Sequence, residues 1–280
     1  MKVSVIGGGT MGNGIAHVFA QFGNEVTLID VKQEYLDRAY GTIGKNLDRM
    51  VKKEKISEAE AKATLARLGT ATDLKAAADS QLVVEAVFEN FAVKQEIFAT
   101  LDAVCSPETI LGSNTSSISL TKIAGTTGRA DRVIGMHFMN PVPMMKLVEI
   151  IRGQATSDET LAFTVKAAED LGKVPVTVQD YPGFIANRLL MPMINEAAYC
   201  LMEGVAEREA IDTVMKLGMA HPMGPLTLAD FIGLDICLDI MEVLYEGFGD
   251  SKYRPCPLLR RMVDAGYLGR KSGKGFYDYE

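Results

Sequence analysis

The sequence lacks an excess of basic residues and long apolar runs. It has 29 Lys and Arg against 36 Asp and Glu, so its formal net charge is −7. Non-specific binders of nucleic acid or anionic membranes need a basic surface, which this composition does not supply. The apolar runs are short, and the first residues do not form the apolar segment of a signal peptide. We therefore expect a soluble, cytoplasmic protein that binds neither nucleic acid nor membrane.

Cysteine is also scarce. The four cysteines are scattered without C-x-x-C spacing; they are Cys105, Cys200, Cys237 and Cys256. This arrangement predicts reduced thiols in a reducing compartment and gives no indication of a metal site.

The first 180 residues alternate short β-branched runs with longer helical patterns. Such alternation is typical of an α/β, Rossmann-type, mostly parallel sheet flanked by helices. The expected strands are residues 2–6, 25–30, 81–87, 109–113, 132–138, 145–151 and 174–179. The charged segment 33–67 is too long for a simple crossover, and a capping-box pattern at Ser57 and Glu60 divides it. It predicts a helical hairpin excursion.

The pattern changes after residue 180, where no strand-like run remains. Apolar residues recur at helical spacing from residue 184 to 246. A chain of 280 residues is longer than most domains that have a single hydrophobic core. We therefore expect a Rossmann-like domain over 1–182 and a smaller all-helical domain over 183–280. Pro182 and Gly183 mark the boundary. We interpret the methionines of the second domain, Met191, Met193, Met202 and Met215, as core residues.

A glycine motif directly follows the first expected strand. Gly7, Gly9 and Gly12 have the G-x-G-x-x-G spacing, in which glycines allow a tight turn and close approach of a pyrophosphate to a helix N-terminus. Asp30 ends the second expected strand, where a carboxylate would accept hydrogen bonds from ribose hydroxyls and repel a 2′-phosphate. The motif predicts NAD binding. The alternative is an ordinary tight turn with Asp30 as a strand-end cap.

Two charged residues follow the third expected strand. Ligands gather beyond the carboxyl ends of parallel strands, so Glu89 and Lys94 are candidates for the wall of the cofactor groove. The alternative is a solvated helix start with an acidic first turn.

Hydride transfer to nicotinamide needs an acid–base group, and histidine suits that role near neutral pH. His137 ends the strand 132–138, and the turn "NPVP" lets the chain return so that Glu149 lies beside it. This arrangement predicts a base with an orienting carboxylate, although a structural histidine fits the same spacing. His17 is expected to be packed or on the surface, and His221 to lie in a turn.

Several longer motifs are more specific than the glycine pattern. They are "GGGTMGNGIA", "VVEAVFEN", "SNTSSISLTKIA", "GMHFMNPVPMMKLVEII", "DYPGFIANRLL", "GPLTLADFIGLD" and "GRKSGKGFYDY". Together they span essentially the whole chain, which thereby resembles the 3-hydroxyacyl-CoA dehydrogenase family. The resemblance implies an NAD-dependent enzyme that interconverts (S)-3-hydroxybutyryl-CoA and acetoacetyl-CoA.

The resemblance also implies roles for individual residues. His137 matches the general base and Glu149 its orienting partner, while Ser116 hydrogen-bonds the substrate oxygen or nicotinamide and Asn187 contacts the thioester. The adjacent Ser117 is the alternative to Ser116, which the 21-residue interval to His137 favours. The implied NAD contacts are Asp30, Glu89, Lys94, Asn140 and Lys271, with Asn114 near the cofactor.

In this family the helical hairpin binds coenzyme A. Lys53 and Arg49, with Lys52 and Lys55 nearby, would meet its phosphates in an otherwise acidic protein. The alternative is a solvated helix face. The resemblance further implies a homodimer formed through the helical domain, which would also contribute to the substrate cleft.

Two rival functions remain from the residues alone. A β-hydroxyacid or sugar-acid dehydrogenase of similar plan would carry a catalytic lysine after the nucleotide domain, but no lysine lies between Lys173 and Lys216. A non-catalytic NAD-binding relative would have no use for the four catalytic candidates together. Acyl chain length and metabolic direction stay open.

Overall fold

The computed structural model describes residues 1–279. The described residues form two compact units, one over Met1–Asp180 and the other beginning at Tyr181. The expected domain boundary, after residue 182, lies two residues further along the chain than this division.

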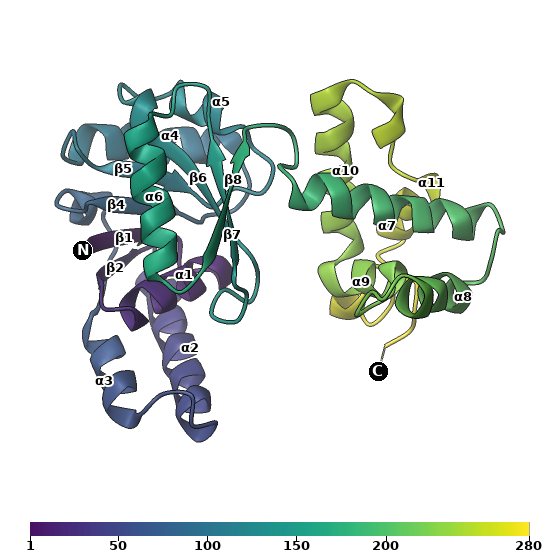
Figure 1. Cartoon of the computed structure of the whole chain (residues 1–280), viewed down its shortest axis with the longest axis horizontal. Helices are drawn as coiled ribbons and strands as arrows, with labels where there is room; N and C mark the ends of the chain where they lie inside the picture. Colours follow the sequence, from purple (N-terminus) through teal and green to yellow (C-terminus); the bar gives the residue numbers. More distant parts are fainter. Residues whose placement is uncertain (280) are drawn as a thin grey trace. The chain divides into compact units, whose positions relative to one another are not determined.

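An eight-stranded sheet organises the N-terminal unit (Figure 1). Its strands are β1 (Lys2–Ile6), β2 (Glu25–Ile29), β3 (Leu68–Ala71), β4 (Leu82–Glu85), β5 (Ile110–Ser113), β6 (Val133–Phe138), β7 (Leu147–Arg152) and β8 (Val174–Gln179). The order is β3-β2-β1-β4-β5-β6-β7-β8, and every neighbouring pair is parallel except β6 and β7. The predicted mostly parallel sheet is confirmed.

One strand was not expected from the sequence. The edge strand β3 reads LGTA and is partly exposed along its length. It lacks the β-branched apolar run that marks the central strands, so its place in the sheet depends on pairing with β2.

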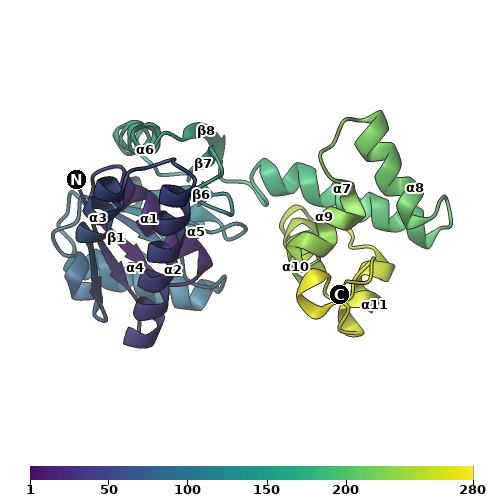
Figure 2. The ribbon, with the colours of Figure 1, turned by 90° about the horizontal axis from the view of Figure 1, so that it is seen from below.

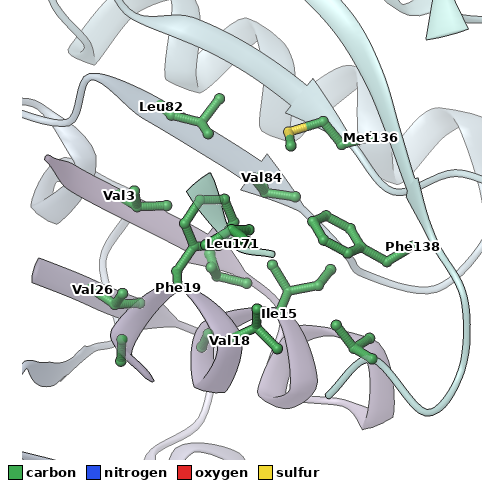
Figure 3. Close-up of a cluster of buried hydrophobic side chains, with 14 of the residues drawn as sticks. Val3, Ile15, Val18, Phe19, Val26, Leu82, Val84, Met136, Phe138 and Leu171 are labelled. Atoms are coloured by element: carbon green, nitrogen blue, oxygen red, sulfur yellow. The ribbon is translucent and has the colours of Figure 1, made fainter. Parts of the chain in front are cut away.

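Helices cover both faces of this sheet. They are α1 (Thr10–Gln21), α2 (Gln33–Lys52), α3 (Glu58–Ala66), α4 (Phe91–Val104), α5 (Leu120–Ala124) and α6 (Asp158–Asp170). Figure 3 shows Ile15 and Phe19 of α1 facing strand residues such as Val3 and Val84 in the main cluster of buried side chains. Figure 1 shows α6 in front of the sheet and α4 and α5 behind it. Burial on both faces explains why these strands are almost continuously apolar.

The predicted helical excursion is confirmed as α2 and α3, which project away from the sheet (Figure 1). The Ser57 hydroxyl accepts from the Glu60 amide, and the Glu60 carboxylate accepts from the Ser57 amide at 2.7 Å. This capping box starts α3 where the charged segment breaks. Leu36, Ile43 and Leu47 form the buried stripe of α2.

The C-terminal unit is helical, as predicted. Its helices are α7 (Ala186–Met202), α8 (Arg208–Thr213), α9 (Pro225–Ile232), α10 (Leu234–Phe248) and α11 (Pro257–Asp264), with a π-helical turn at Val214–Gly218. Figure 2 shows α7 beside α9 and α10. Within residues 181–279 the structure has only isolated β-bridges and no strand. None of the described helices of the chain is long and apolar enough to cross a membrane.

The interpretation of the methionines was only partly right. Met191 is in the helical core, and Met202 packs against it. Met193 and Met215 instead line an apolar hollow between α7 and α8. Helical periodicity predicts an apolar face, but it does not show whether another part of the chain covers that face.

Two buried aspartates hold the end of the chain against the helical core. Asp230 accepts hydrogen bonds from the amides of Phe276 and Tyr277, each at 2.9 Å. Asp212 accepts from the amides at the start of α9 and, at 3.0 Å, from the Tyr277 hydroxyl. Both carboxylates are almost fully buried and therefore need these donors.

Candidate active site

The glycine loop after β1 is packed too tightly for side chains at two positions. Gly7 has φ of +105°, and a Cβ atom there would lie 2.8 Å from the Ala86 carbonyl oxygen. A Cβ atom at Gly12 would lie 1.7 Å from the Gly7 carbonyl oxygen. Gly9 is the N-cap of α1 and makes no side-chain cap. The loop therefore presents backbone amides at the helix start, where a phosphate would bind.

A cavity of about 710 Å³ opens above this loop. Gly7, Gly9, Asp30 and Asn140 line it, together with side chains from α2 and α4. Its volume is within the range of cofactor sites. The Asp30 carboxylate accepts from the amides of Gly8 at 2.6 Å and Val31 at 2.7 Å. These bonds hold the carboxylate at the cavity, and each oxygen retains a lone pair for a ligand hydroxyl.

Lys94 does not belong to a solvated helix start, so that alternative is wrong. The side chain is 1% exposed, and its Nζ lies 2.7 Å from Glu85 Oε1 and 3.3 Å from Glu89 Oε2. Glu85 also accepts from Ser113 Oγ at 2.7 Å. Neither Lys94 nor Glu89 is among the residues that line the cavity. The ammonium is thus held between two carboxylates behind the cavity wall.

Glu89 organises the segment 114–119, which we call the serine loop. Its Oε1 accepts from the amides of Ser116 and Ser117, each at 2.9 Å, and from the Ser117 hydroxyl at 3.0 Å. Burial opposes ionisation of Glu89, but the Lys94 charge and the hydrogen bonds from Thr115, Ser116 and Ser117 outweigh it and lower the pKa. The carboxylate therefore stays charged and fixes both candidate serines.

This role of Glu89 was missed in the sequence. The serine loop lies 27 residues after Glu89, and no local pattern connects the two segments. They meet because β4 and β5 are adjacent and parallel, so that their carboxyl ends share one edge.

His137 and Glu149 lie directly opposite each other on β6 and β7. His137 Nδ1 is 2.7 Å from Glu149 Oε2, and the two residues are 8% and 2% exposed. Phe138 faces the main core and packs edge-on against Phe19, so the alternation of the strand turns His137 to the other side. The two side chains meet because β7 runs antiparallel to β6.

Asn114 lies beside this pair. Its side-chain oxygen accepts from the Phe138 amide at 2.9 Å, which ties the serine loop to the end of β6. Asn140 follows β6 and lines the cavity. Of the other histidines, His17 is fully buried in α1, and His221 is half-buried.

Two candidate residues belong to the C-terminal unit. Asn187 lies in the first turn of α7 and is 9% exposed. Its backbone N–H donates to the Gly183 carbonyl at 3.1 Å. The Lys271 ammonium pairs with Asp235 at 2.5 Å.

The coenzyme A candidates lie at the end of α2, in the N-terminal unit. Arg49, Lys52, Lys53 and Lys55 are exposed, and no carboxylate of residues 1–279 pairs with them within 4 Å. Their charges are available to an anionic ligand. In the described part of the chain, no group of three His, Cys, Asp or Glu side chains is arranged to hold a metal ion.

Comparisons with known proteins agree with this arrangement. Residues 2–181 match the model of the 3-hydroxyacyl-CoA dehydrogenase NAD binding domain, and residues 183–279 match the model of the C-terminal domain of the same family. The predicted cofactor, NAD, is therefore confirmed.

Two curated relatives and one solved structure match this chain over nearly their whole length. The chain is 59% identical to a probable 3-hydroxybutyryl-CoA dehydrogenase of Deinococcus radiodurans, with 100% of both chains covered. It is 55% identical to 3-hydroxybutyryl-CoA dehydrogenase of Bradyrhizobium diazoefficiens, over 99% of this chain and 95% of the relative. The crystal structure of (S)-3-hydroxybutyryl-CoA dehydrogenase from Ralstonia eutropha has a TM-score of 0.98 at 50% identity, covering 100% of this chain and 99% of the other. The chain belongs to the 3-hydroxyacyl-CoA dehydrogenase family, as its motifs predicted.

Proposed function

We propose that this chain is an NAD-dependent (S)-3-hydroxybutyryl-CoA dehydrogenase, which interconverts (S)-3-hydroxybutyryl-CoA and acetoacetyl-CoA. The observation that carries the proposal is the buried His137–Glu149 pair, on the same sheet edge as the dinucleotide cavity. Relatives that match along the whole chain carry this name, which supplies the substrate class.

The cavity fits NAD. When bound, NAD⁺ supplies the hydride acceptor at C4 of its nicotinamide. The backbone at Gly7, Gly9 and Gly12 would hold the pyrophosphate, and Asp30 would accept from the ribose hydroxyls. Further contacts would come from Asn140 and Asn114, while Glu89 and Lys94 would support the wall of the cavity from behind rather than contact NAD. Lys271 is a further candidate contact that rests on the family resemblance. Asp30 also disfavours NADP, because its charge repels a 2′-phosphate.

His137 acts as the general base in the oxidative direction. A neutral imidazole that donates its Nδ1 proton to Glu149 has its lone pair on Nε2, which takes the proton of the substrate hydroxyl. Glu149 keeps the ring in this tautomer and stabilises the imidazolium that results. In the reductive direction the same nitrogen returns the proton.

Ser116 and Asn187 hold the oxygens of the substrate. The Ser116 hydroxyl hydrogen-bonds the 3-oxygen, and Glu89 contributes by fixing the amides of the serine loop. Asn187 contacts the thioester carbonyl. Hydrogen bonds to an oxygen whose charge changes during the reaction lower the barrier when the donors are held in place beforehand.

Coenzyme A is held by the exposed cations at the end of α2. Lys53 and Arg49 are the main candidates, with Lys52 and Lys55 as neighbours that could substitute. Their lack of carboxylate partners within residues 1–279 leaves the positive charge uncompensated for phosphate groups. Replacing Lys53 by Ala should therefore raise the KM for acetoacetyl-CoA more than it raises the Kd for NADH.

The enzyme works in the cytoplasm as a homodimer. The four thiols are free, which suits a reducing compartment. The apolar hollow at Met193 and Met215 and exposed side chains such as Leu217, 81% exposed, offer the helical unit a surface to bury against a second copy. Light scattering coupled to size exclusion should give twice the chain mass, and Leu217→Asp should shift it toward the monomer.

The activity is tested by following NADH absorbance with acetoacetyl-CoA, with free acetoacetate and without substrate. We expect NADH oxidation with acetoacetyl-CoA alone, and much slower turnover with NADPH. Oxidation with the free acid would indicate a β-hydroxyacid dehydrogenase, and NADH binding without turnover would indicate a non-catalytic relative. Repeating the assay over a series of acyl lengths, with kcat/KM for each, defines the preferred substrate.

A further inference from the structure

Lys173 is a buried cation for which the proposed chemistry has no use. It lies between α6 and β8 and is 9% exposed. Within residues 1–279 no carboxylate pairs with its ammonium within 4 Å. Removing an ammonium from water is unfavourable unless hydrogen bonds replace the lost hydration, and here burial lowers its pKa.

Two carbonyl groups replace that hydration. Both belong to residues 139–146, which connect β6 to β7 and which we call the β6–β7 turn. Lys173 Nζ donates to the Val142 carbonyl at 2.6 Å and to the Met145 carbonyl at 2.7 Å. Within the turn, the amides of Met144 and Met145 donate to the Pro141 carbonyl, and at its far end the Lys146 carbonyl accepts from the Val174 amide at 2.8 Å. The ammonium therefore ties the Val142 and Met145 carbonyls of the turn to the segment that immediately precedes β8.

The β6–β7 turn is a wall of the nucleotide cavity. Its residues Asn140, Pro141, Val142 and Pro143 all line that cavity. Helix α1 supports the turn from the other side: a Cβ atom at Gly14 would lie 2.9 Å from Val142 Cβ. The turn is thus held between the first helix of the dinucleotide motif and the Lys173 ammonium, and it joins the strands that carry His137 and Glu149.

His17 completes the surroundings of Lys173. It lies on α1 one turn after Gly14, is fully buried, and its two ring nitrogens have no hydrogen-bond partner among the described residues. Burial, with a further contribution from the Lys173 charge, lowers the pKa of His17 to about 4. His17 is therefore neutral at physiological pH, and the Lys173 ammonium is the charge that remains beneath the turn.

We propose that Lys173 is a positioning residue for the cofactor: its ammonium holds the β6–β7 turn in the conformation that forms the wall of the nucleotide cavity. Lys173 acts through the turn, by way of Asn140 and Val142, rather than on the reacting atoms. This inference rests on the proposed function, since it assumes that NAD binds in that cavity.

The test compares Lys173→Met with Lys166→Met. Lys166 lies on the exposed side of α6, its side chain is 67% exposed, and it pairs with Asp170 four residues further along the helix. We expect Lys173→Met to raise the Kd of NADH, titrated by fluorescence, about tenfold, because the turn loses two charge-assisted hydrogen bonds. The KM for NADH should rise in parallel, while the KM for acetoacetyl-CoA changes less than about twofold. Lys166→Met should match the wild type.

A merely structural lysine would give a different result. It would lower the melting temperature and leave the Kd of NADH unchanged in the folded protein, which would overturn the proposal. If Lys173→Met is recovered only as aggregate, Lys173→Gln decides, because it keeps amide donors but loses the charge and part of the reach. An intermediate loss of NADH affinity supports the proposal, and an unchanged affinity overturns it. A wild-type protein that binds no NADH would refute the proposed function instead.

Discussion

Buried ionisable side chains in the N-terminal unit gather at one edge of the sheet, whereas those in the C-terminal unit hold chain segments together. At the sheet edge, Glu85 and Lys94 pair at the end of β4, His137 and Glu149 pair across β6 and β7, and Lys173 immediately precedes β8. These charges are paired with side chains or with a turn next to the cavity.

The C-terminal unit uses buried carboxylates differently. Asp212 and Asp230 accept hydrogen bonds mainly from backbone amides of α9 and of the last residues of the chain. A carboxylate that is satisfied by the backbone stabilises a fold, while one that orients an imidazole or a loop can also serve chemistry. Substitutions in the two units should therefore separate into effects on turnover and effects on stability.

The largest effect should come from His137→Gln. Glutamine cannot take up the hydroxyl proton, so kcat should fall about thousandfold, within the range of general-base catalysis, while NADH still binds. Steady-state kinetics and an NADH titration measure the two quantities separately. The half-buried His221, changed to Gln, should retain turnover. Near-normal turnover of His137→Gln would remove His137 from the mechanism.

Asp212→Ala should lower the stability of the protein and leave its turnover almost unchanged. It leaves the amides of Leu226 and Thr227 without their acceptor in a buried site, and it removes one of the two acceptors of the Tyr277 hydroxyl, which also donates to the Arg208 carbonyl. We expect a loss of about 3 kcal/mol in the free energy of unfolding, measured in urea, with kcat of the folded protein almost unchanged. Asp264→Ala, at an exposed position of α11, is the control. A large loss of kcat without a loss of stability would contradict this division between the units.

His17 should make the N-terminal unit sensitive to acid. Its pKa is lowered from 6.5 to about 4 in the folded protein, so between these values the unfolded chain binds more protons. The contribution of neutral His17 to the free energy of unfolding is therefore present above about pH 6.5 and is lost as the pH decreases. The loss should reach about 2 kcal/mol at pH 5. His17→Leu cannot titrate, and its stability should fall less over the same interval. His221→Gln should keep the wild-type slope; equal slopes for His17→Leu and wild type would contradict the prediction.

Glu89→Ala should give the smallest of the four effects. The amides of Ser116 and Ser117 lose their acceptor, and the serine loop is no longer fixed. We expect kcat/KM for acetoacetyl-CoA to fall about tenfold, the equivalent of one or two hydrogen bonds. Glu96→Ala, which removes an exposed carboxylate on α4, the helix that follows Glu89, should have no effect. If both variants behave alike, the loop does not depend on Glu89.

Local sequence patterns were enough to predict most of the fold. β-branched runs located seven of the strands, the Ser57 capping box located the break between α2 and α3, and helical periodicity described the C-terminal unit. The glycine motif and Asp30 could likewise be recognised in the sequence, because the turn, the helix start and the strand end that they mark lie close together in the chain. Each of these features depends on residues near one another in sequence.

Contacts between distant residues decided the rest. The edge strand β3 exists because β2 pairs with it, and Met193 and Met215 line a surface hollow because no described segment of the chain covers them. Glu89 reaches the serine loop, and Lys173 reaches the β6–β7 turn across about 30 residues of sequence, because parallel strands bring their ends to one edge. Spacing along a chain indicates which residues can be neighbours locally, but the order of strands in the sheet determines which distant side chains meet.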